Sequence, residues 1–207
     1  PHEFQPQKFF HLIFATSGMT LLVSGIPLLA SNLGHSDHKT LASIGAMSMV
    51  SRIPLLLVMG FESILTSEFS VRIADGQMTR SATLQLSMVG PLLGVLGGLV
   101  GALCGPEVVT LVAGPLRNVD RLSMTLMSSG AGLCLGSLLL APLLIALRAH
   151  LQLSALWLTS AAVLGGIMIF TDGSTSSVAL SFLLATLFAQ TTMSGFAVSR
   201  VGRTLSI

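Results

Sequence analysis

The chain contains six long apolar segments separated by short polar stretches, and only 9% of its 207 residues are charged. A helix that crosses the hydrocarbon core of a bilayer needs about 20 consecutive, mainly apolar residues. The pattern therefore predicts an all-α protein, a polytopic bundle of six transmembrane helices that forms a single domain over residues 1–207. The expected helices cover about 9–33, 41–74, 84–104, 122–147, 153–170 and 178–198.

Two of the expected helices carry features that alter their shape. Pro27 has no N–H group to donate, which predicts a kink in the helix over 9–33. The helix over 41–74 is longer than a bilayer requires. Its second half carries Glu68 and Arg72 and is expected to leave the membrane as an amphipathic extension.

Small residues form regular rows in two of the segments. In the helix over 84–104 they recur at every fourth position, namely Gly90, Gly94, Gly98 and Ala102, with a second row at Gly97 and Gly101. Gly132 and Gly136 share one face of the helix over 122–147. Such rows let neighbouring helices approach closely, so they predict tight packing against other helices. A loop is expected at Gly105–Glu107, followed by a short apolar stretch.

The two cysteines show no pattern of a disulfide or a metal site. Cys104 and Cys134 lie at or within apolar segments, without a CxxC spacing or a histidine at ligand spacing. We interpret both as small packing residues.

The basic residues are divided unevenly between the two ends of the expected bundle. Six spans place both termini on one side of the membrane, and that side carries Lys8, Arg72, Arg80, Arg148, Arg200 and Arg203. The opposite side carries Lys39, Arg117 and Arg121. Because cytoplasmic loops are enriched in Lys and Arg, this distribution predicts cytoplasmic termini. The net charge of +2 and the lack of a basic run argue against a nucleic-acid partner.

Arg52 is a cation well inside the second apolar segment. A charge at such a depth is costly unless it faces protein or water, and it is typical of a substrate or ion path. A helical projection places Ser48, Ser63, Thr66 and Ser70 near the same stripe. We therefore predict a hydrated cavity wall, with Arg52, Ser48, Ser63 and Thr66 as substrate-binding residues. The alternative is a structural arginine that pairs with a carbonyl or an acid of another helix, or extends to the membrane surface.

Other polar groups within the segments suggest further roles. Glu62 is the only other acid well inside an apolar segment, so it is the candidate for ion coupling or for balancing the charge of Arg52. Its distance of ten residues from Arg52 argues against a direct pair within one helix. Gln190 and Asn32 are uncharged and are typical of hydrogen bonds between helices.

No motif of hydrolytic or nucleotide chemistry occurs in the chain. It lacks GxSxG, HExxH and Walker patterns and paired acids. We therefore expect no enzymatic activity, no cofactor and no metal site.

Two stretches resemble a known family. The segment Ser51–Leu57 (SRIPLLL), followed by Ala74–Gly76 (ADG), is similar to the eighth transmembrane helix of actinobacterial polysaccharide-export flippases. Gly105–Val109 (GPEVV), running to Ala113–Gly114, resembles an extracellular element of the same group. These flippases belong to the superfamily of multidrug, oligosaccharidyl-lipid and polysaccharide exporters. The resemblance covers about residues 21–148.

The resemblance implies a transporter of two six-helix lobes, of which this chain would be the C-terminal one. Its partners would be membrane lipids, an N-terminal lobe or partner membrane subunit, and a polyprenyl-diphosphate-linked saccharide. The saccharide would be flipped by alternating access across the plasma membrane of a bacterium. Arg52 would attract the diphosphate or acidic sugars of this cargo.

Two other functions fit the same sequence. A cation-coupled drug exporter of the same superfamily would depend on Glu62. A non-transporting membrane scaffold for cell-envelope synthesis would need neither Glu62 nor Arg52 for transport. An integral-membrane transferase is disfavoured because no loop is polar enough to bind a nucleotide sugar. The start at Pro1 rather than at a methionine suggests a piece of a longer protein.

Overall fold

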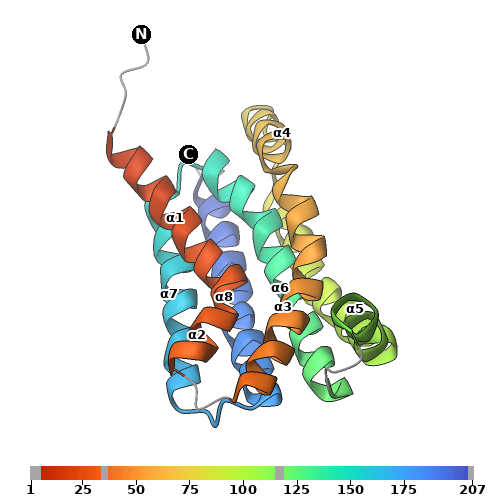
Figure 1. Cartoon of the computed structure of the whole chain (residues 1–207). Helices are drawn as coiled ribbons and strands as arrows, with labels where there is room; N and C mark the ends of the chain where they lie inside the picture. Colours follow the sequence, from red (N-terminus) through yellow and green to blue (C-terminus); the bar gives the residue numbers. More distant parts are fainter. Residues whose placement is uncertain (1–5, 34–36, 115–118, 205–207) are drawn as a thin grey trace.

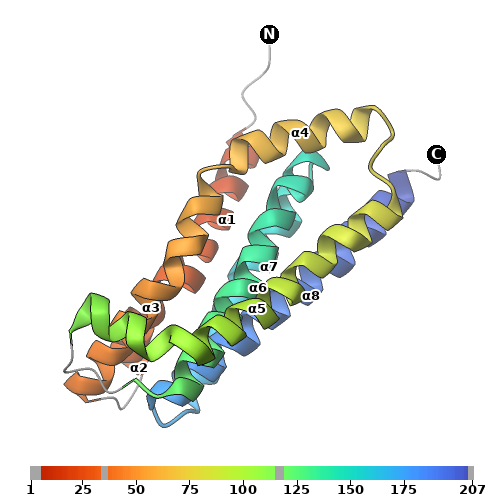
Figure 2. The same ribbon diagram turned by 90° about the vertical axis from the view of Figure 1, so that its right-hand side faces the viewer.

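The computed structural model describes residues 6–33, 37–114 and 119–204, and the regular structure within these ranges is entirely α-helical. The helices are α1 (Pro6–Ser24), α2 (Ile26–Leu33), α3 (His38–Met59), α4 (Glu62–Ala74), α5 (Arg80–Ala113), α6 (Arg121–Ala146), α7 (His150–Ile169) and α8 (Thr175–Thr204). Most of them run side by side in one bundle, while α4 crosses one end of it (Figures 1 and 2).

Five of the helices are long and apolar enough to cross a membrane, namely α3, α5, α6, α7 and α8. The bent pair of α1 and α2 supplies a sixth span if the two are counted as one. The prediction of an all-α polytopic membrane bundle is thus confirmed. Helix α1 begins and α8 ends at the same end of the bundle (Figure 1), as an even number of spans requires.

The first span is broken at Gly25. Helices α1 and α2 meet there at an angle of 72°, which confirms the kink expected from Pro27. Pro27 is the second residue of α2 and cannot donate a hydrogen bond back to the preceding turn. The break therefore leaves backbone carbonyls at the end of α1 without a partner in their own helix.

The second expected helix is two helices, so the prediction of one helix over 41–74 is wrong. Helix α3 ends at Met59, where the N–H of Phe61 bonds the carbonyl of Val58 at 2.9 Å. Helix α4 then starts at Glu62 and runs across the end of the bundle (Figure 2). The sequence is apolar on both sides of this turn, and only Gly60, Glu62 and Ser63 interrupt it, so hydropathy averaged over a span does not show the change of direction.

The loop expected at Gly105–Glu107 is also wrong, because α5 continues as one helix to Ala113. Pro106 lies inside this helix, and Gly105 is buried against the side chain of Met124. A helix keeps its backbone groups bonded where little water is present, so a single proline costs less than leaving the helix. Helix α5 changes direction toward this end (Figure 2).

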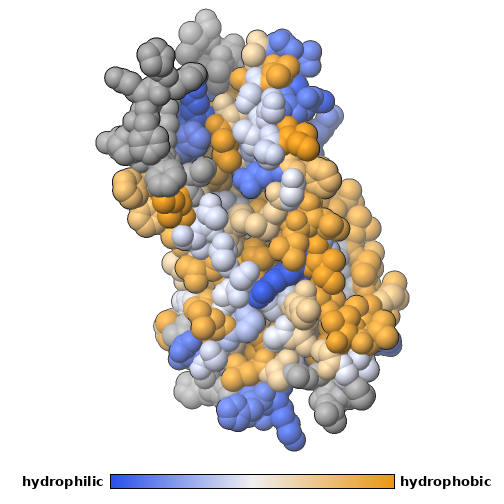
Figure 3. Space-filling view, turned by 45° about the horizontal axis from the view of Figure 1, so that its top comes forward, coloured by the Kyte–Doolittle hydropathy of each residue, from blue (hydrophilic) through white to orange (hydrophobic). Residues whose placement is uncertain are grey.

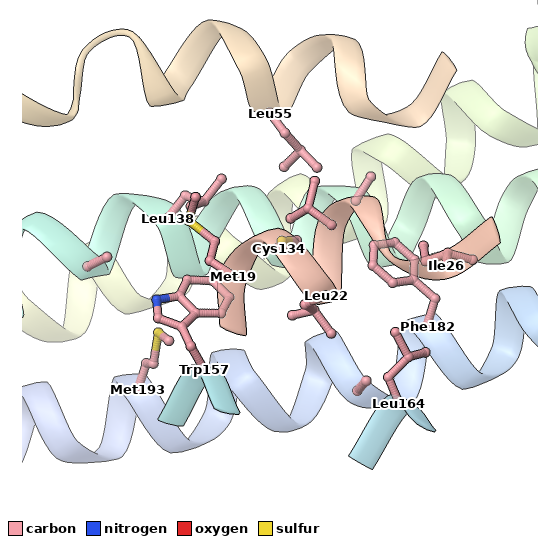
Figure 4. Close-up of a cluster of buried hydrophobic side chains, with 14 of the residues drawn as sticks. Met19, Leu22, Ile26, Leu55, Cys134, Leu138, Trp157, Leu164, Phe182 and Met193 are labelled. Atoms are coloured by element: carbon pink, nitrogen blue, oxygen red, sulfur yellow. The ribbon is translucent and has the colours of Figure 1, made fainter. Parts of the chain in front are cut away.

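Helix α6 lies at the centre of the bundle and contacts its neighbours over most of its length. Its apolar core includes Cys134 and Leu138, and the indole of Trp157 on α7 lies near Met19 of α1 and Met193 of α8 (Figure 4). Cys104 and Cys134 are both free thiols. Cys134 is fully buried and fits its interpretation as a packing residue, whereas Cys104 is exposed on α5, so that interpretation is wrong for Cys104.

The rows of small residues form the contact between α5 and α6. The glycines of α5 lie directly against residues of α6. Gly94 lies against Leu133, Gly97 against Ser128, Gly98 against Ser129, and Gly101 against Met124. From the other side, Gly132 approaches the backbone of Leu93, and Gly136 that of Gly90. The predicted tight packing of these rows is therefore confirmed.

Charged residues gather at the two ends of the bundle. Arg72, Arg80, Arg148 and Arg200 lie at the end where α1 begins and α8 ends, and Lys39 and Arg121 lie at the opposite end. Arg117 is outside the described residues. Figure 3 shows a broad apolar area between hydrophilic ends, and this is the surface that a bilayer would cover.

The contact between α5 and α6 generates a prediction about stability. A methyl group at Gly132 would meet the carbonyl of Leu93, and backbone atoms cannot move aside by changing a rotamer. We expect Gly132→Ala to destabilise the protein by about 1–3 kcal/mol. Thermal unfolding in detergent would measure this.

The matched control is Gly165→Ala on α7. A methyl group at Gly165 meets no atom within 4 Å, so the higher helix propensity of alanine should stabilise the protein by about 1 kcal/mol. A Gly132→Ala protein as stable as this control would contradict the close approach of α5 and α6.

Candidate functional site

Arg52 lies on α3 beside the break in the first span. Its Nη2 donates to the carbonyl oxygen of Ser24 at 3.0 Å and to Oγ of Ser48 at 2.7 Å. The Nε–H of Arg52 is buried and has no hydrogen-bond partner among the described residues, and the same holds for Oγ of neighbouring Ser51. The Nη2 group of the guanidinium is thus hydrogen-bonded within the protein, whereas its Nε–H group is not.

The bond to Ser24 gives Arg52 a structural role. Ser24 is the last residue of α1, where carbonyl groups lack helical partners and the helix dipole is negative. A cation at this position satisfies a carbonyl that would otherwise be costly at membrane depth. This is the alternative role weighed from the sequence, a pairing with a carbonyl of another helix. The unpartnered Nε leaves donor capacity for an anion as well.

The predicted polar stripe is not continuous, so this part of the prediction is wrong. Ser48 and Arg52 lie together on α3, whereas Ser63 and Thr66 lie on α4, beyond the turn at Gly60. Thr66 Oγ1 donates to the carbonyl of Glu62 at 2.8 Å. Ser63 is exposed. Of the four candidate substrate-binding residues, the fold brings together only Ser48 and Arg52.

Ser70, the last residue of the expected stripe, donates a hydrogen bond within α4, as Thr66 does. Its Oγ donates to the carbonyl of Thr66 at 2.8 Å, so it bonds its own helix. The hydroxyl groups of α4 therefore do not extend the polar surface that begins at Arg52.

Glu62 lies at the start of α4 and faces a small cavity. The cavity has a volume of about 100 Å³ and lies between α1, α6 and α7. Apart from Glu62 and Thr16 its lining is apolar, namely Ala15, Met19, Met59, Ala141, Ile145, Leu153 and Trp157. The ion pairs among the described residues are Glu68–Arg72 and Glu107–Arg121, so Glu62 has no cationic partner there. Burial raises the pKa of the Glu62 carboxyl.

A second cavity, not anticipated from the sequence, lies between α5 and α8. It is an open groove of about 690 Å³ that runs from Arg80 and Gly202 at the end of the bundle to Pro91 and Gln190. Its lining is mainly apolar, with Leu84, Met88 and Val198 among the residues. Among the described residues that line it, Arg80 is the charged one.

A sequence signal for this groove existed. Thr191, Gly195 and Ser199 recur at every fourth position on α8, in the same spacing as the glycines of α5. Small side chains on one face leave room that a larger ligand or a neighbouring helix can fill.

Gln190 at the inner end of the groove joins three helices. Its Nε2 donates to the carbonyl of Ser87 at 3.0 Å and to Oγ of Ser194 at 3.3 Å, and its Oε1 accepts from Ser137 at 3.0 Å. The expected role as a hydrogen bond between helices is confirmed. Asn32 instead bonds the carbonyl of Leu28 in its own helix at 2.8 Å.

No family model, curated protein or solved structure matches the chain. The features that bear on function are therefore Arg52 at the break of the first span, the cavity at Glu62, and the groove between α5 and α8. Within the described ranges, no group of three or more His, Cys, Asp or Glu residues could hold a metal ion.

The position of Glu62 predicts a dependence of stability on pH. Because its pKa is raised, the folded protein binds more protons than the unfolded chain between the two pKa values, so stability falls as the pH rises. We expect Glu62→Gln to raise the thermal unfolding temperature near neutral pH. The gain should shrink as the pH falls below the ordinary pKa of a glutamate.

The control is Glu68→Gln, which changes an exposed carboxylate that Arg72 already pairs at 2.8 Å. This substitution should give no such gain. An equal response of both variants at every pH would show that the cavity does not penalise the charge of Glu62.

Proposed function

We propose that the chain is one lobe of a membrane transporter that moves a polyprenyl-diphosphate-linked saccharide. The observation that carries this proposal is Arg52 at the break of the first span, with its Nε–H buried and unpartnered. Transporters bind substrates near the middle of the membrane, commonly where a helix is interrupted. A guanidinium with spare donors at such a break suits an anionic group, above all a diphosphate.

The depth of Arg52 supports this role. It lies about two thirds of the way along α3 (His38–Met59), so the nearer end of this span is about 10 Å away and the other about 21 Å at 1.5 Å per residue. Its cost at that depth is reduced by the Ser24 carbonyl and the Ser48 hydroxyl, which also hold the guanidinium in place. Ser48 thus acts as a positioning residue in this proposal.

The setting we propose is the plasma membrane of a bacterium, with both termini in the cytoplasm. The concentration of arginines at the end where α1 begins and α8 ends supports this orientation. A second lobe or partner subunit would enclose the substrate path, because alternating access requires two units that move against each other.

Two observations favour other functions of the same chain. The unpaired carboxylate of Glu62 in its cavity suits a cation-coupled exporter. The two hydrogen bonds of Arg52 within the fold suit a non-transporting scaffold for envelope synthesis, in which the arginine only stabilises the break. The experiment below separates both from the main proposal.

The test is a leaflet-accessibility assay for lipid-linked saccharide in native membranes, in cells depleted of other flippases. Arg52→Gln removes the charge and is two bonds too short to reach the Ser24 carbonyl as Nη2 does, whereas Arg52→Lys keeps the charge. We expect Arg52→Gln to lower the transport rate at least about tenfold, since a charge-assisted hydrogen bond contributes about 1.5–3 kcal/mol. Arg52→Lys should retain part of the rate. Both variants should lower the unfolding temperature because they weaken the bond to the Ser24 carbonyl, so the transport rates are compared per amount of folded protein.

Two further variants complete the design. Arg148→Gln removes an exposed arginine at the end of the bundle and should transport normally. Glu62→Gln should also leave the rate unchanged, whereas a loss of saccharide transport in this variant would show that transport is coupled to a cation through Glu62. Normal transport by a stable Arg52→Gln protein would refute the proposed substrate role. No transport by the unmodified protein would favour the scaffold.

A further inference from the structure

We propose that the groove between α5 and α8 binds one anionic glycerophospholipid, with its phosphate at Arg80 and an acyl chain along the groove toward Gln190. This site is separate from Arg52 and does not depend on the proposed function. The assignment follows from three properties of the groove, which are its depth, the state of its polar groups and the position of Arg80, the charged residue among the described residues that line it.

The depth of the groove matches one leaflet of a membrane. From Arg80 to Pro91, α5 rises by about 16 Å at 1.5 Å per residue. Half of a hydrocarbon core of about 30 Å is about 15 Å. The groove therefore starts at a membrane surface and ends near the midplane, where Gln190 closes it. An acyl chain of a single leaflet fits this length, whereas a polyprenyl chain extends well beyond it.

The polar groups along the groove are bonded within the protein. Ser87 Oγ donates to the carbonyl of Thr83 at 2.9 Å, and Thr191 Oγ1 donates to that of Leu187 at 2.9 Å. Gln190 Nε2 is shared between the Ser87 carbonyl and Ser194 Oγ. With these donors occupied, the groove offers an apolar surface to a hydrocarbon chain and little to a sugar.

The charge of Arg80 lies at the outer end of the groove. Arg80 is the first residue of α5, where the helix dipole is positive and disfavours a cation. It is exposed, and no ion pair of the described residues includes it. A lipid phosphate would satisfy both the guanidinium and the positive end of α5. Charge complementarity therefore favours an anionic headgroup over a zwitterionic one.

Two glycines of α8 provide variants that fill the groove without disturbing the fold. A Cβ atom at Gly195 or at Gly202 meets no atom within 4 Å, so a leucine at either position extends into open space. Gly165→Leu on α7 is the matched control, because its Cβ is equally unobstructed and it does not line the groove. Arg148→Gln is the control for Arg80→Gln, since both remove one exposed arginine at the same end of the bundle.

The experiment is native mass spectrometry of the full chain, released from micelles that contain equal amounts of phosphatidylglycerol and phosphatidylcholine. We expect one retained phospholipid, with a preference of about fivefold for phosphatidylglycerol, the effect of one basic residue on an anionic lipid. Gly195→Leu and Gly202→Leu should lose the retained lipid. Arg80→Gln should keep a lipid but lose the preference, and both controls should behave like the unmodified protein.

Three results would overturn the inference. The first is retention of the lipid by Gly195→Leu and Gly202→Leu at the level of Gly165→Leu. The second is a preference in Arg80→Gln equal to that in Arg148→Gln. The third is displacement of phosphatidylglycerol by an equimolar amount of polyprenyl phosphate, which would assign the groove to a carrier lipid instead. Because the readout is bound lipid, a failure here is distinguishable from a failure of transport at Arg52.

Discussion

The structure depends on one constraint, which is that backbone polar groups at membrane depth must find partners inside the protein. A continuous helix would meet this constraint, but the first span is broken at Gly25. The carbonyl of Ser24, at the end of α1, therefore has no partner within its own helix. Arg52 of α3 supplies the missing donor. A single hydrogen bond thus ties the second span to the weak point of the first. The same constraint keeps α5 helical through Pro106, where a water-soluble protein would be expected to turn.

Close contact between backbones gives the rest of the bundle its shape. Between helices in lipid there is little hydrophobic driving force, so van der Waals contact and hydrogen bonds hold them together. The glycines of α5 and α6 allow the two backbones to touch near Gly90 and Gly136, and Gln190 of α8 reaches the same crossing. These three helices form a fixed unit. By contrast, α3 diverges from α5 and α8 toward the end where α4 crosses the bundle (Figure 2).

The sequence predicted the helices and their packing rows well because both depend on local patterns, namely apolar run length and glycine spacing. It predicted the site less well. The turn at Gly60 has apolar sequence on both sides and is marked only by Gly60, Glu62 and Ser63, so the sequence places Ser63 and Thr66 on the same helix as Arg52, whereas they lie on α4. The partner of Arg52 is 28 residues away, and only the direction of the bend at Gly25 brings it near. The groove forms between α5 and α8, so a pattern within one helix does not predict it. The spacing of Thr191 and Gly195 indicates only that one face of α8 is lined by small residues.

The structural role of Arg52 and its proposed role in substrate binding need not exclude each other. Its Nη2 is used twice by the fold, at 3.0 Å and 2.7 Å, which fixes the plane of the guanidinium. A fixed guanidinium loses less conformational entropy when it binds an anion, so the structural bonds would improve a binding site rather than occupy it. Leaving the Nε–H buried without a partner is costly, and a bound anion would remove that cost. The unpartnered Nε–H is therefore the feature that favours a ligand at this break over a simple helix cap.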